Sequence, residues 1–231
     1  MKYKMLLLAT VMVAFTSALF AQEDMKETIG MIKKNLADSK GNLKKYEWVE
    51  TTTFYLKGEK KSVKQSQCYY GVDGKLTKVA TGASTQTKTP GGLKGKIVAN
   101  KKEEMADYVK AAVAKVQTYL PPDAEKIQKV YGAGKLSVNI LEPGKKFKLG
   151  FPDYNEKGDL LSLSFDKTSQ KLMAADVSTY VDDPKQTVIF NVTYSNLPDG
   201  TQYPGSTTLD AKAKELKIVI ENSGFKKAAG H

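Results

Sequence analysis

Histidine and cysteine, the side chains best suited to nucleophilic, acid–base or metal chemistry, are scarce in this 231-residue chain. It contains one histidine, His231, and one cysteine, Cys68. A histidine-based triad needs a histidine held firmly by the fold, and we expect the final residue to be mobile. A cysteine-ligated zinc site needs several thiolates. Neither chemistry is expected here, and Cys68, in a strand-like segment, is predicted to be a buried apolar residue.

The segment FPDYNEKGD partly matches a calcium-binding loop. Asp153, Asn155 and Gly158 occupy the first, third and sixth positions of an EF-hand pattern. The fifth position is Lys157, and the twelfth, where a bidentate glutamate is required, is Ser164. Because the lysine would repel a cation, the sequence favours a hairpin turn over a metal site.

Two other patterns partly resemble catalytic or phosphate-binding motifs. Asp182 and Asp183 are adjacent, so at a strand end their carboxylates point to opposite sides, and a solvated turn is favoured. The segment GGLKG, residues 91–95, lacks the Lys-Ser/Thr pair of a phosphate-binding loop and is predicted to be a flexible loop. We therefore expect no catalytic residue, no metal and no cofactor. An enzyme whose carboxylates are assembled by the fold stays an alternative without a motif.

The charge of the chain is strongly basic and comes from one residue type. All 36 basic residues are lysine, the net charge is +11, and lysines are spread along the chain in runs no longer than two. Arginine is the preferred residue for bidentate contacts to phosphate and guanine, and nucleic-acid binders concentrate it in basic stripes. Nucleic acid is therefore not an expected partner. Two alternatives remain, a lysine-coated surface and attraction to anionic lipid head groups.

Residues 1–21 have the pattern of a secretory signal peptide. Lys2 and Lys4 precede an apolar run over residues 5–15, and small residues lead to a predicted cleavage after Ala21. The alternatives are a membrane anchor or a buried helix, but the run is shorter than the ~20 residues that a membrane span needs. No cysteine lies near the cleavage zone, so we expect a periplasmic protein that is not a lipoprotein. Residues 22–231 are predicted to form a single domain.

Hydrophobic periodicity predicts an α+β fold with a large antiparallel sheet. Helices are expected over residues 24–38 and 101–120, followed by a short helix capped by Asp123, and residues 82–96 are expected to form a loop. Ten strands are expected, over residues 45–57, 61–70, 75–81, 135–141, 146–151, 160–165, 171–181, 186–194, 205–209 and 215–221. The predicted architecture is a curved sheet, a half-open β-barrel of about ten strands, with an N-terminal helix and a central helical lid.

The strongest functional signal is apolar surface around the first sheet strands and the second helix. The segment KYEWVETTTFYLKG carries large rings on both alternating faces, unlike a half-exposed strand. We expect its Trp48 and Phe54 face to line a hollow or a core, joined there by Tyr69, and its other face to meet a packed helix. The candidate ligand-binding residues are Tyr46, Trp48, Phe54, Leu56, Tyr69, Met105, Tyr108, Val109 and Val113. An apolar pocket of this kind suits an acyl chain, and the alternative is a dry core.

The order of these elements resembles the LolA/LolB-like lipoprotein-carrier superfamily. The resemblance is carried by the helix before KYEWVETTTFYLKG, by the second strand and turn QCYYGVDGKLTKVAT, and by the terminal DGTQYPGSTTLDAKAKELKIVIENSGF. It implies that helices plug a half-open barrel, which binds the acyl chains of a lipid or lipoprotein and ferries them across the periplasm. Envelope membrane proteins would act as donor or acceptor.

One departure from that family concerns the lid. A strand arginine holds the lid helices shut in the well-studied carriers, and this chain has no arginine, so that role passes to no residue here. A lysine or a hydroxyl could replace it, or the ligand could differ. The alternative function is a non-catalytic cell-envelope module with a dry core and a partner on the sheet edge.

Overall fold

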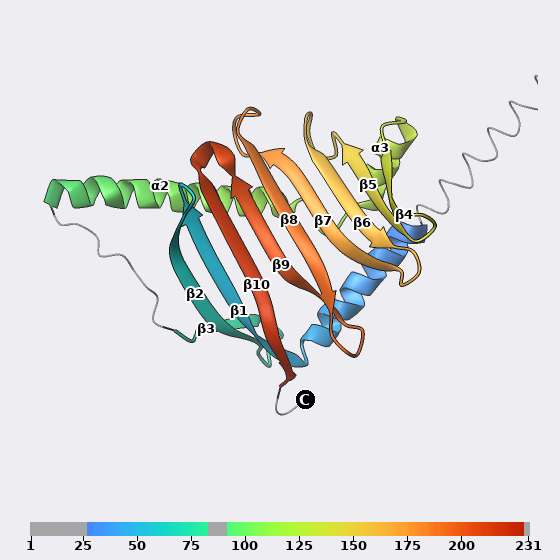
Figure 1. The fold of residues 1–231 in the computed structure, drawn as a ribbon, viewed down its shortest axis with the longest axis horizontal. Helices are drawn as coiled ribbons and strands as arrows, with labels where there is room; N and C mark the ends of the chain where they lie inside the picture. The colour runs from blue at the N-terminus through green and yellow to red at the C-terminus, as the bar shows by residue number, and fades with distance from the viewer. Residues whose placement is uncertain (1–26, 83–91, 229–231) are drawn as a thin grey trace, which may run out of the picture.

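The fold is built on one ten-stranded antiparallel sheet, as predicted (Figure 1). The structure, a computed structural model, describes residues 27–82 and 92–228, without the side chains of residues 92–102. The predicted signal peptide and His231 lie outside the described residues. The strands, in spatial order, are β3 (Leu76–Ala80), β2 (Glu59–Tyr70), β1 (Tyr46–Leu56), β10 (Leu216–Lys227), β9 (Gln202–Ala211), β8 (Thr187–Asn196), β7 (Lys171–Tyr180), β6 (Leu160–Asp166), β5 (Lys146–Pro152) and β4 (Ser137–Glu142).

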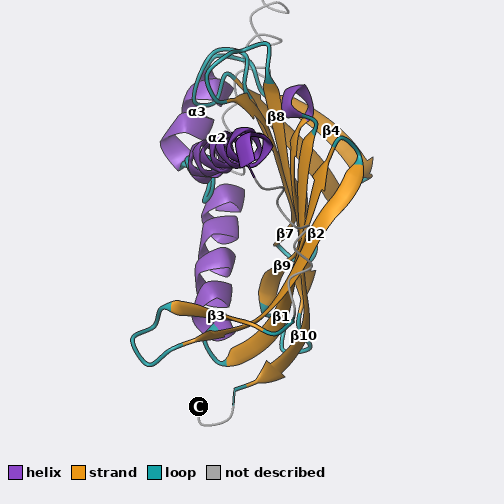
Figure 2. Ribbon diagram, turned by 90° about the vertical axis from the view of Figure 1, so that its left-hand side faces the viewer, coloured by secondary structure: helices purple, strands orange, loops and turns teal. Residues whose placement is uncertain are grey.

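The helices cover one face of this sheet, which we call the inner face (Figure 2). They are the N-terminal helix (residues 27–43), α2 (Gly92–Gln117) and α3 (Ala124–Gly132), and a short 3-10 turn, η1 (Lys212–Lys214), joins β9 to β10. Asp123 caps α3 as expected, because its Oδ1 accepts hydrogen bonds from the backbone N–H groups of Glu125 and Lys126, at 2.8 and 3.1 Å. Among the described residues, no helix is long and apolar enough to cross a membrane.

The two main helices extend beyond their predicted limits. Residues 92–96 were expected to be loop because Gly92 and Gly95 disfavour a helix, yet α2 begins at Gly92. The loop prediction for residues 83–91 lies outside the described residues. The N-terminal helix continues to residue 43 instead of ending at Asp38. The hydroxyl of Ser39, in this extra turn, accepts a hydrogen bond from the backbone N–H of Gln202 at 3.0 Å, so the helix end is tied to the sheet.

The strand boundaries also differ where turn residues misled the prediction. The turn between β1 and β2 consists of Lys57 and Gly58, both with positive φ (56° and 75°), so β2 starts at Glu59 instead of residue 61. The last two strands are longer than the predicted 205–209 and 215–221. Gly224, beyond the predicted end, has a φ of 64° beside the register shift between β1 and β10, so it marks an irregularity within the strand.

Strand register aligns one apolar side chain from each of seven strands in a continuous row. Its members, from β1 to β5, are Phe54, Ile218, Leu209, Phe190, Val177, Leu161 and Phe151. Val177, Leu161 and Phe151 are at most 1% exposed, whereas Phe54 and Ile218 are only half-buried. The row therefore runs from a fully covered half of the inner face to a partly covered half.

The covered half lies under two helices. Ile29 and Ile32 of the N-terminal helix and Ile127 and Val130 of α3 belong to the same buried cluster as the side chains of β5, β6 and β7. Their spacing follows the turns of each helix, so each helix presents one apolar stripe to the sheet. This cluster is the main core of the protein.

Candidate functional site: the α2 seam

The partly covered half of the inner face lies beneath the C-terminal part of α2. A small buried cluster lies here, formed by Ala112, Val188, Leu209, Ala211 and Leu216. Five half-buried side chains pack against it, Met105, Tyr108 and Val109 from the helix and Phe54 and Ile218 from the sheet. We call these five residues the α2 seam.

One polar atom inside the α2 seam has no hydrogen-bond partner among the described residues. The hydroxyl of Tyr108 is buried and unpaired, and burial, followed by the charge of Asp182, raises the pKa of this phenol. The ammonium nitrogen of Lys214, on η1, lies 5.3 Å from the centre of the Tyr108 ring. A hydroxyl of this kind normally finds a partner when buried, so the seam offers a free donor next to a cation.

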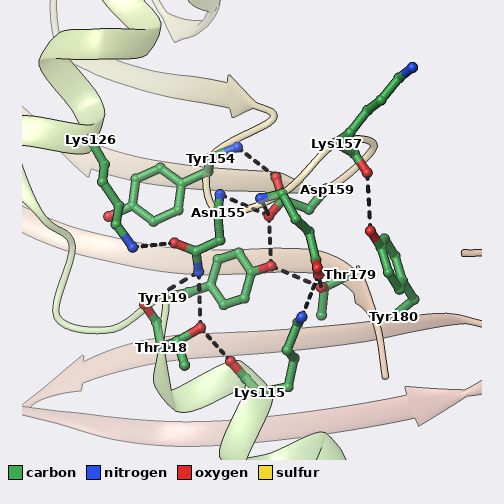
Figure 3. Close-up of polar contacts among 11 residues, drawn as sticks. Lys115, Thr118, Tyr119, Lys126, Tyr154, Asn155, Lys157, Asp159, Thr179 and Tyr180 are labelled. Carbon is green, nitrogen blue, oxygen red and sulfur yellow. Dashed lines mark hydrogen bonds and ion pairs between the residues drawn. The ribbon is translucent and has the colours of Figure 1, made fainter. Parts of the chain in front are cut away.

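The C-terminal end of α2, in contrast, is fastened to the sheet by buried hydrogen bonds (Figure 3). The hydroxyl of Tyr119, just after the helix, donates to Asp159 Oδ2 at 2.7 Å and lies 2.8 Å from Thr179 Oγ1. Tyr119 is fully buried, and Asp159 and Thr179 are each 2% exposed. Burial, the largest cause, raises the pKa of the Tyr119 phenol well above its ordinary value.

An ion pair reinforces this attachment one turn earlier. Lys115 Nζ lies 2.6 Å from Glu156 Oε1, and the side chains of both residues are about three-quarters buried. Burial opposes ionisation of Glu156, but hydrogen bonds from Lys115 and Thr179 outweigh it and lower the pKa of the carboxyl. Tyr119 and Lys115 together connect α2 to the β5–β6 loop and to β7. One of these contacts comes from a hydroxyl and the other from a lysine.

The loop that resembles a calcium site is held by its own hydrogen bonds. Asp159 accepts from the backbone N–H groups of Tyr154, Asn155 and Glu156 at 2.6 to 2.9 Å. Asp153 accepts from Gly158 N–H at 2.9 Å and pairs with Lys135 at 2.7 Å. These carboxylates close a turn between β5 and β6. Within the described residues, no three His, Cys, Asp or Glu side chains are grouped to hold a metal ion.

Five of the nine predicted ligand-binding residues lie at or beside the α2 seam. Phe54, Met105, Tyr108 and Val109 form most of it. Leu56 lies two residues along the strand on the same face and pairs with buried Leu216. Here the sequence-based grouping of a strand with a helix about fifty residues away agrees with the packing.

Tyr46 and Trp48 share that face but form a separate group at the far end of β1. The Trp48 indole donates to Asn222 Oδ1 at 3.0 Å and stacks on Phe225, with ring centres 5.5 Å apart. The Tyr46 hydroxyl donates to Asp199 Oδ2 at 2.7 Å. Both rings are 7% exposed, so they are buried in local contacts.

Polar residues separate this aromatic group from the α2 seam. Glu50 and Thr52 occupy the intervening positions on the same face of β1. Glu50 Oε2 lies 2.6 Å from Lys78 Nζ. The predicted apolar surface along the whole strand is therefore interrupted by an ion pair.

The remaining two predicted residues lie elsewhere. Tyr69 pairs with Glu47, whereas Trp48 pairs with Cys68, so Tyr69 points to the opposite face of the sheet. The expectation that it joins Trp48 is wrong, because a difference of one residue in register reverses the face. Val113 is 39% exposed on α2. Cys68 is fully buried, as predicted.

The expectation that the other face of β1 meets a packed helix is also wrong. All the described helices lie on the inner face, with Phe54 (Figure 2). Tyr55 belongs to the outer face by alternation. The second aromatic face of β1 therefore lies on the outer face of the sheet, where none of the described helices packs.

Sequence patterns did not predict that Ile218 and Lys214 lie at the α2 seam, or that Tyr119 contacts Asp159. Alternation within LKIVI showed that Ile218 had a buried face, but only the pairing of β10 with β1 places it beside Phe54. Lys214 is one of many lysines, and no local pattern separates it from the others. Tyr119 precedes two prolines and Asp159 follows a glycine, which predicts turns and gives no sign of a buried contact.

Comparison with known proteins gives matches at the level of the fold alone. No family model and no curated protein matches the sequence. A solved structure of a DUF1329 family protein from Desulfovibrio piger is 10% identical, with a TM-score of 0.41 over 89% of this chain and 94% of that chain. A second match is a LolA superfamily protein from Nitrosomonas europaea. It is also 10% identical, with a TM-score of 0.37 over 85% of this chain and 93% of that one.

Proposed function

We propose that this protein is an exported, periplasmic binding or carrier protein for the acyl chains of a lipid or lipoprotein, held in the α2 seam. The observation that carries the proposal is the half-covered end of the apolar row, where Phe54 and Ile218 meet a helix that encloses the unpaired hydroxyl of Tyr108. Apolar side chains with one convergent polar group are typical of a small-molecule site. The protein would contribute binding and no covalent chemistry.

The chemistry of the seam suits an amphipathic ligand with a carboxyl or ester group. Burial of a chain against Phe54, Ile218 and Met105 would supply the affinity, at roughly 0.8 kcal/mol for each buried CH₂ group. The hydroxyl of Tyr108 would donate to the ligand's oxygen, and Lys214 would attract a negative charge on the same group. The ligand would thus lie with its tail on the sheet and its polar end toward η1.

In this proposal α2 serves as a lid that is fastened at one end. Tyr119 and Lys115 fix its C-terminal end through hydrogen bonds and an ion pair. Among the described side chains of the helix before Lys115, Lys110 pairs with Asp107, and this ion pair stays within the helix. The lid would therefore open by movement of its N-terminal part away from β1 and β10, with the Tyr119 contact intact.

Binding can be tested with the protein purified gently from its own envelope and examined by native mass spectrometry. We expect a bound lipid mass, and we expect the lipid-free protein to take up a fluorescent fatty acid. Tyr108→Phe should weaken that uptake about tenfold, because one hydrogen bond to a charged group is lost. Tyr69→Phe, on the opposite face, is the matched control and should leave the affinity unchanged. Protein without lipid and without uptake contradicts the proposal, and equal effects of the two variants remove the role of Tyr108.

The periplasmic location and the partners rest on the sequence. The signal-peptide pattern and the resemblance to the lipoprotein carriers support export, with envelope membrane proteins as donor or acceptor. Fractionation of cells followed by N-terminal sequencing tests this, and we expect a mature chain that begins at Gln22. A chain retained with its first residues in the membrane fraction would contradict it.

A second candidate function is a cell-envelope interaction module that uses a sheet edge. The edge strand β4 exposes Val138, Ile140 and Leu141 by 56%, 59% and 47%. An exposed apolar edge of this kind can pair with a strand of another chain. Val138→Thr with Ile140→Thr should abolish the capture of such a partner and leave fatty-acid uptake intact. The reverse outcome would favour the α2 seam as the functional surface.

A further inference from the structure

One end of the sheet carries a concentration of lysines that the linear sequence does not reveal. β1 pairs with β2 on one side and with β10 on the other, so residues 57–64 and residues 212–217 flank the same end of β1. Lys57 N–H donates to Glu215 O at 2.8 Å between the two segments. These two segments form what we call the basic rim. Its lysines are Lys57, Lys60, Lys61, Lys64, Lys212, Lys214 and Lys217. Against these seven stand two acidic residues, Glu59 and Glu215, so the rim has a net charge of +5.

Most of this charge is available to a partner. Every lysine of the rim except half-buried Lys214 is exposed. Lys61 pairs with Glu59, and the other five exposed lysines form no ion pair within the described residues. Outside the rim, Asp210 of β9 is the acidic residue that pairs directly with Lys217 of β10.

The turns over the other strands at the same end of the sheet carry no such excess of lysine. The β7–β8 turn contains two aspartates and one lysine. In the β5–β6 loop, Asp153 and Glu156 are each paired with a lysine, and Asp159 is buried. The excess of positive charge at this end therefore lies over β1 and β10, so the rim presents a specific direction to an anionic partner.

We propose that the basic rim docks the protein on the surface of an anionic phospholipid bilayer. Lysine ammonium groups are mobile point charges that suit a diffuse layer of phosphates, whereas a partner that needs bidentate contacts would favour arginine. The turns over β5 to β8 lack such an excess of lysine. The bilayer would therefore contact the β1 and β10 side of this end, beside α2 (Figure 1).

The position of the rim connects it with the α2 seam. Lys214 of the rim lies over the ring of Tyr108, which belongs to the seam. Figure 1 shows α2 continuing past β1 and β2 on this side. The first part of that helix, residues 92–102, contains four lysines and no acidic residue. Docking by the rim would bring the lid end of the seam to the membrane, although the docking itself depends on the charges alone and not on acyl-chain binding.

Co-sedimentation with vesicles tests the proposal. We expect the full chain to bind phosphatidylcholine vesicles that contain phosphatidylglycerol, to bind pure phosphatidylcholine vesicles weakly, and to be released in about 1 M salt, where the screening length falls to about 3 Å. Neutralising the unpaired rim lysines with Lys60→Gln, Lys64→Gln and Lys212→Gln should lower the partition constant about 100-fold, from roughly fivefold for each lysine.

The matched control removes the same charge from the helices that cover the other half. Lys33→Gln, Lys40→Gln and Lys129→Gln neutralise three exposed lysines that form no ion pair among the described residues. This variant should bind almost as wild type does. An equal loss of vesicle binding in the two triple variants would show that net charge, and not the basic rim, determines binding, and would overturn the proposal. Binding independent of phosphatidylglycerol would overturn it in favour of another partner, such as an acidic protein. Fatty-acid uptake measured without vesicles reports separately on the α2 seam, so the two proposals fail independently.

Discussion

The two halves of the inner face are built from the same apolar row but are covered differently. Under the N-terminal helix and α3, fourteen residues of the described chain form one buried cluster, whereas five do so under α2. Phe151 at one end of the row is fully buried, and Phe54 at the other end is half-buried. The same type of side chain on the same sheet thus belongs to a core in one half and to a partly open contact in the other.

This difference is the basis for the proposal that one half of the sheet serves stability and the other half serves binding. In the β5 to β7 half, helices cover the sheet with several turns of apolar side chains, and removing them would expose the main core. Along α2, the helix meets the sheet through half-buried side chains and is attached at its C-terminal end by Tyr119 and Lys115. Local opening is expected where few apolar contacts are buried, and the proposed ligand site therefore lies in that half.

The largest expected effect separates the two halves by stability. Phe151→Ala should lower the free energy of unfolding by about 4 kcal/mol, because it leaves a cavity in a sealed core. Phe54→Ala should cost about 1–2 kcal/mol, because its ring is already partly hydrated and its surroundings can relax. Urea denaturation of both variants measures the difference. Equal losses would mean that the α2 half is as well packed as the core, and would remove the distinction.

A second pair of variants compares two tyrosines of the same lid. Tyr119→Phe should destabilise the protein by about 2 kcal/mol, because buried Asp159 loses a hydrogen-bond donor. Tyr108→Phe should be neutral or slightly stabilising without ligand, because its hydroxyl has no partner among the described residues. Thermal unfolding of lipid-free protein is the measurement. A loss in Tyr108→Phe as large as in Tyr119→Phe would show that Tyr108 is also a structural anchor.

A smaller effect, on the pH dependence of stability, tests a hydrogen bond at the far end of β1. The hydrogen bond from Tyr46 is the largest cause that lowers the pKa of Asp199 to about 2, followed by the backbone N–H of Thr201. An unfolded aspartate has a pKa of about 3.9, so this carboxylate adds stability above about pH 4 that is lost as the pH falls toward 2. The Tyr46–Asp199 contact joins β1 to the β8–β9 turn.

Tyr46→Phe removes that contact without changing a charge. We expect lower stability than wild type at neutral pH and a shallower loss between about pH 4 and pH 2, so that the two proteins converge in acid. Urea midpoints measured across this range provide the test, with Tyr55→Phe on the same strand as the control. Parallel curves for Tyr46→Phe and wild type would show that the hydrogen bond does not control the titration of Asp199.

The sequence was sufficient for the architecture because periodicity is a local property. The alternation in LLSLSF, the helical spacing of Ile29 and Ile32, and the cap at Asp123 each depend on neighbouring residues, and each agrees with the structure. The predicted element boundaries were wrong near glycines, because glycine is found both in turns and within helices or strands. Gly92 begins a helix, although a loop was predicted there, and Gly224 lies within a strand that was predicted to end at residue 221.

The candidate site was predicted in part, because it depends on register and topology. Phe54, Tyr108 and Val109 were grouped correctly from the apolar excess of their segments. Tyr69 was placed on the wrong face, since the pairing of Trp48 with Cys68 cannot be deduced from either strand alone. The basic rim likewise arises only when β10 pairs with β1, which joins segments about 150 residues apart.

The most direct test of the acyl-chain site is a map of where a lipid touches the protein. A fatty acid that carries a photoactivatable diazirine on its chain would be bound to the lipid-free protein, cross-linked and located by peptide mass spectrometry. We predict cross-links to α2 around Met105 to Val109 and to β1 and β10 around Phe54 and Ile218, reduced by an excess of unlabelled fatty acid. Cross-links confined to the outer face or to the β4 edge, or none that unlabelled fatty acid displaces, would contradict the account.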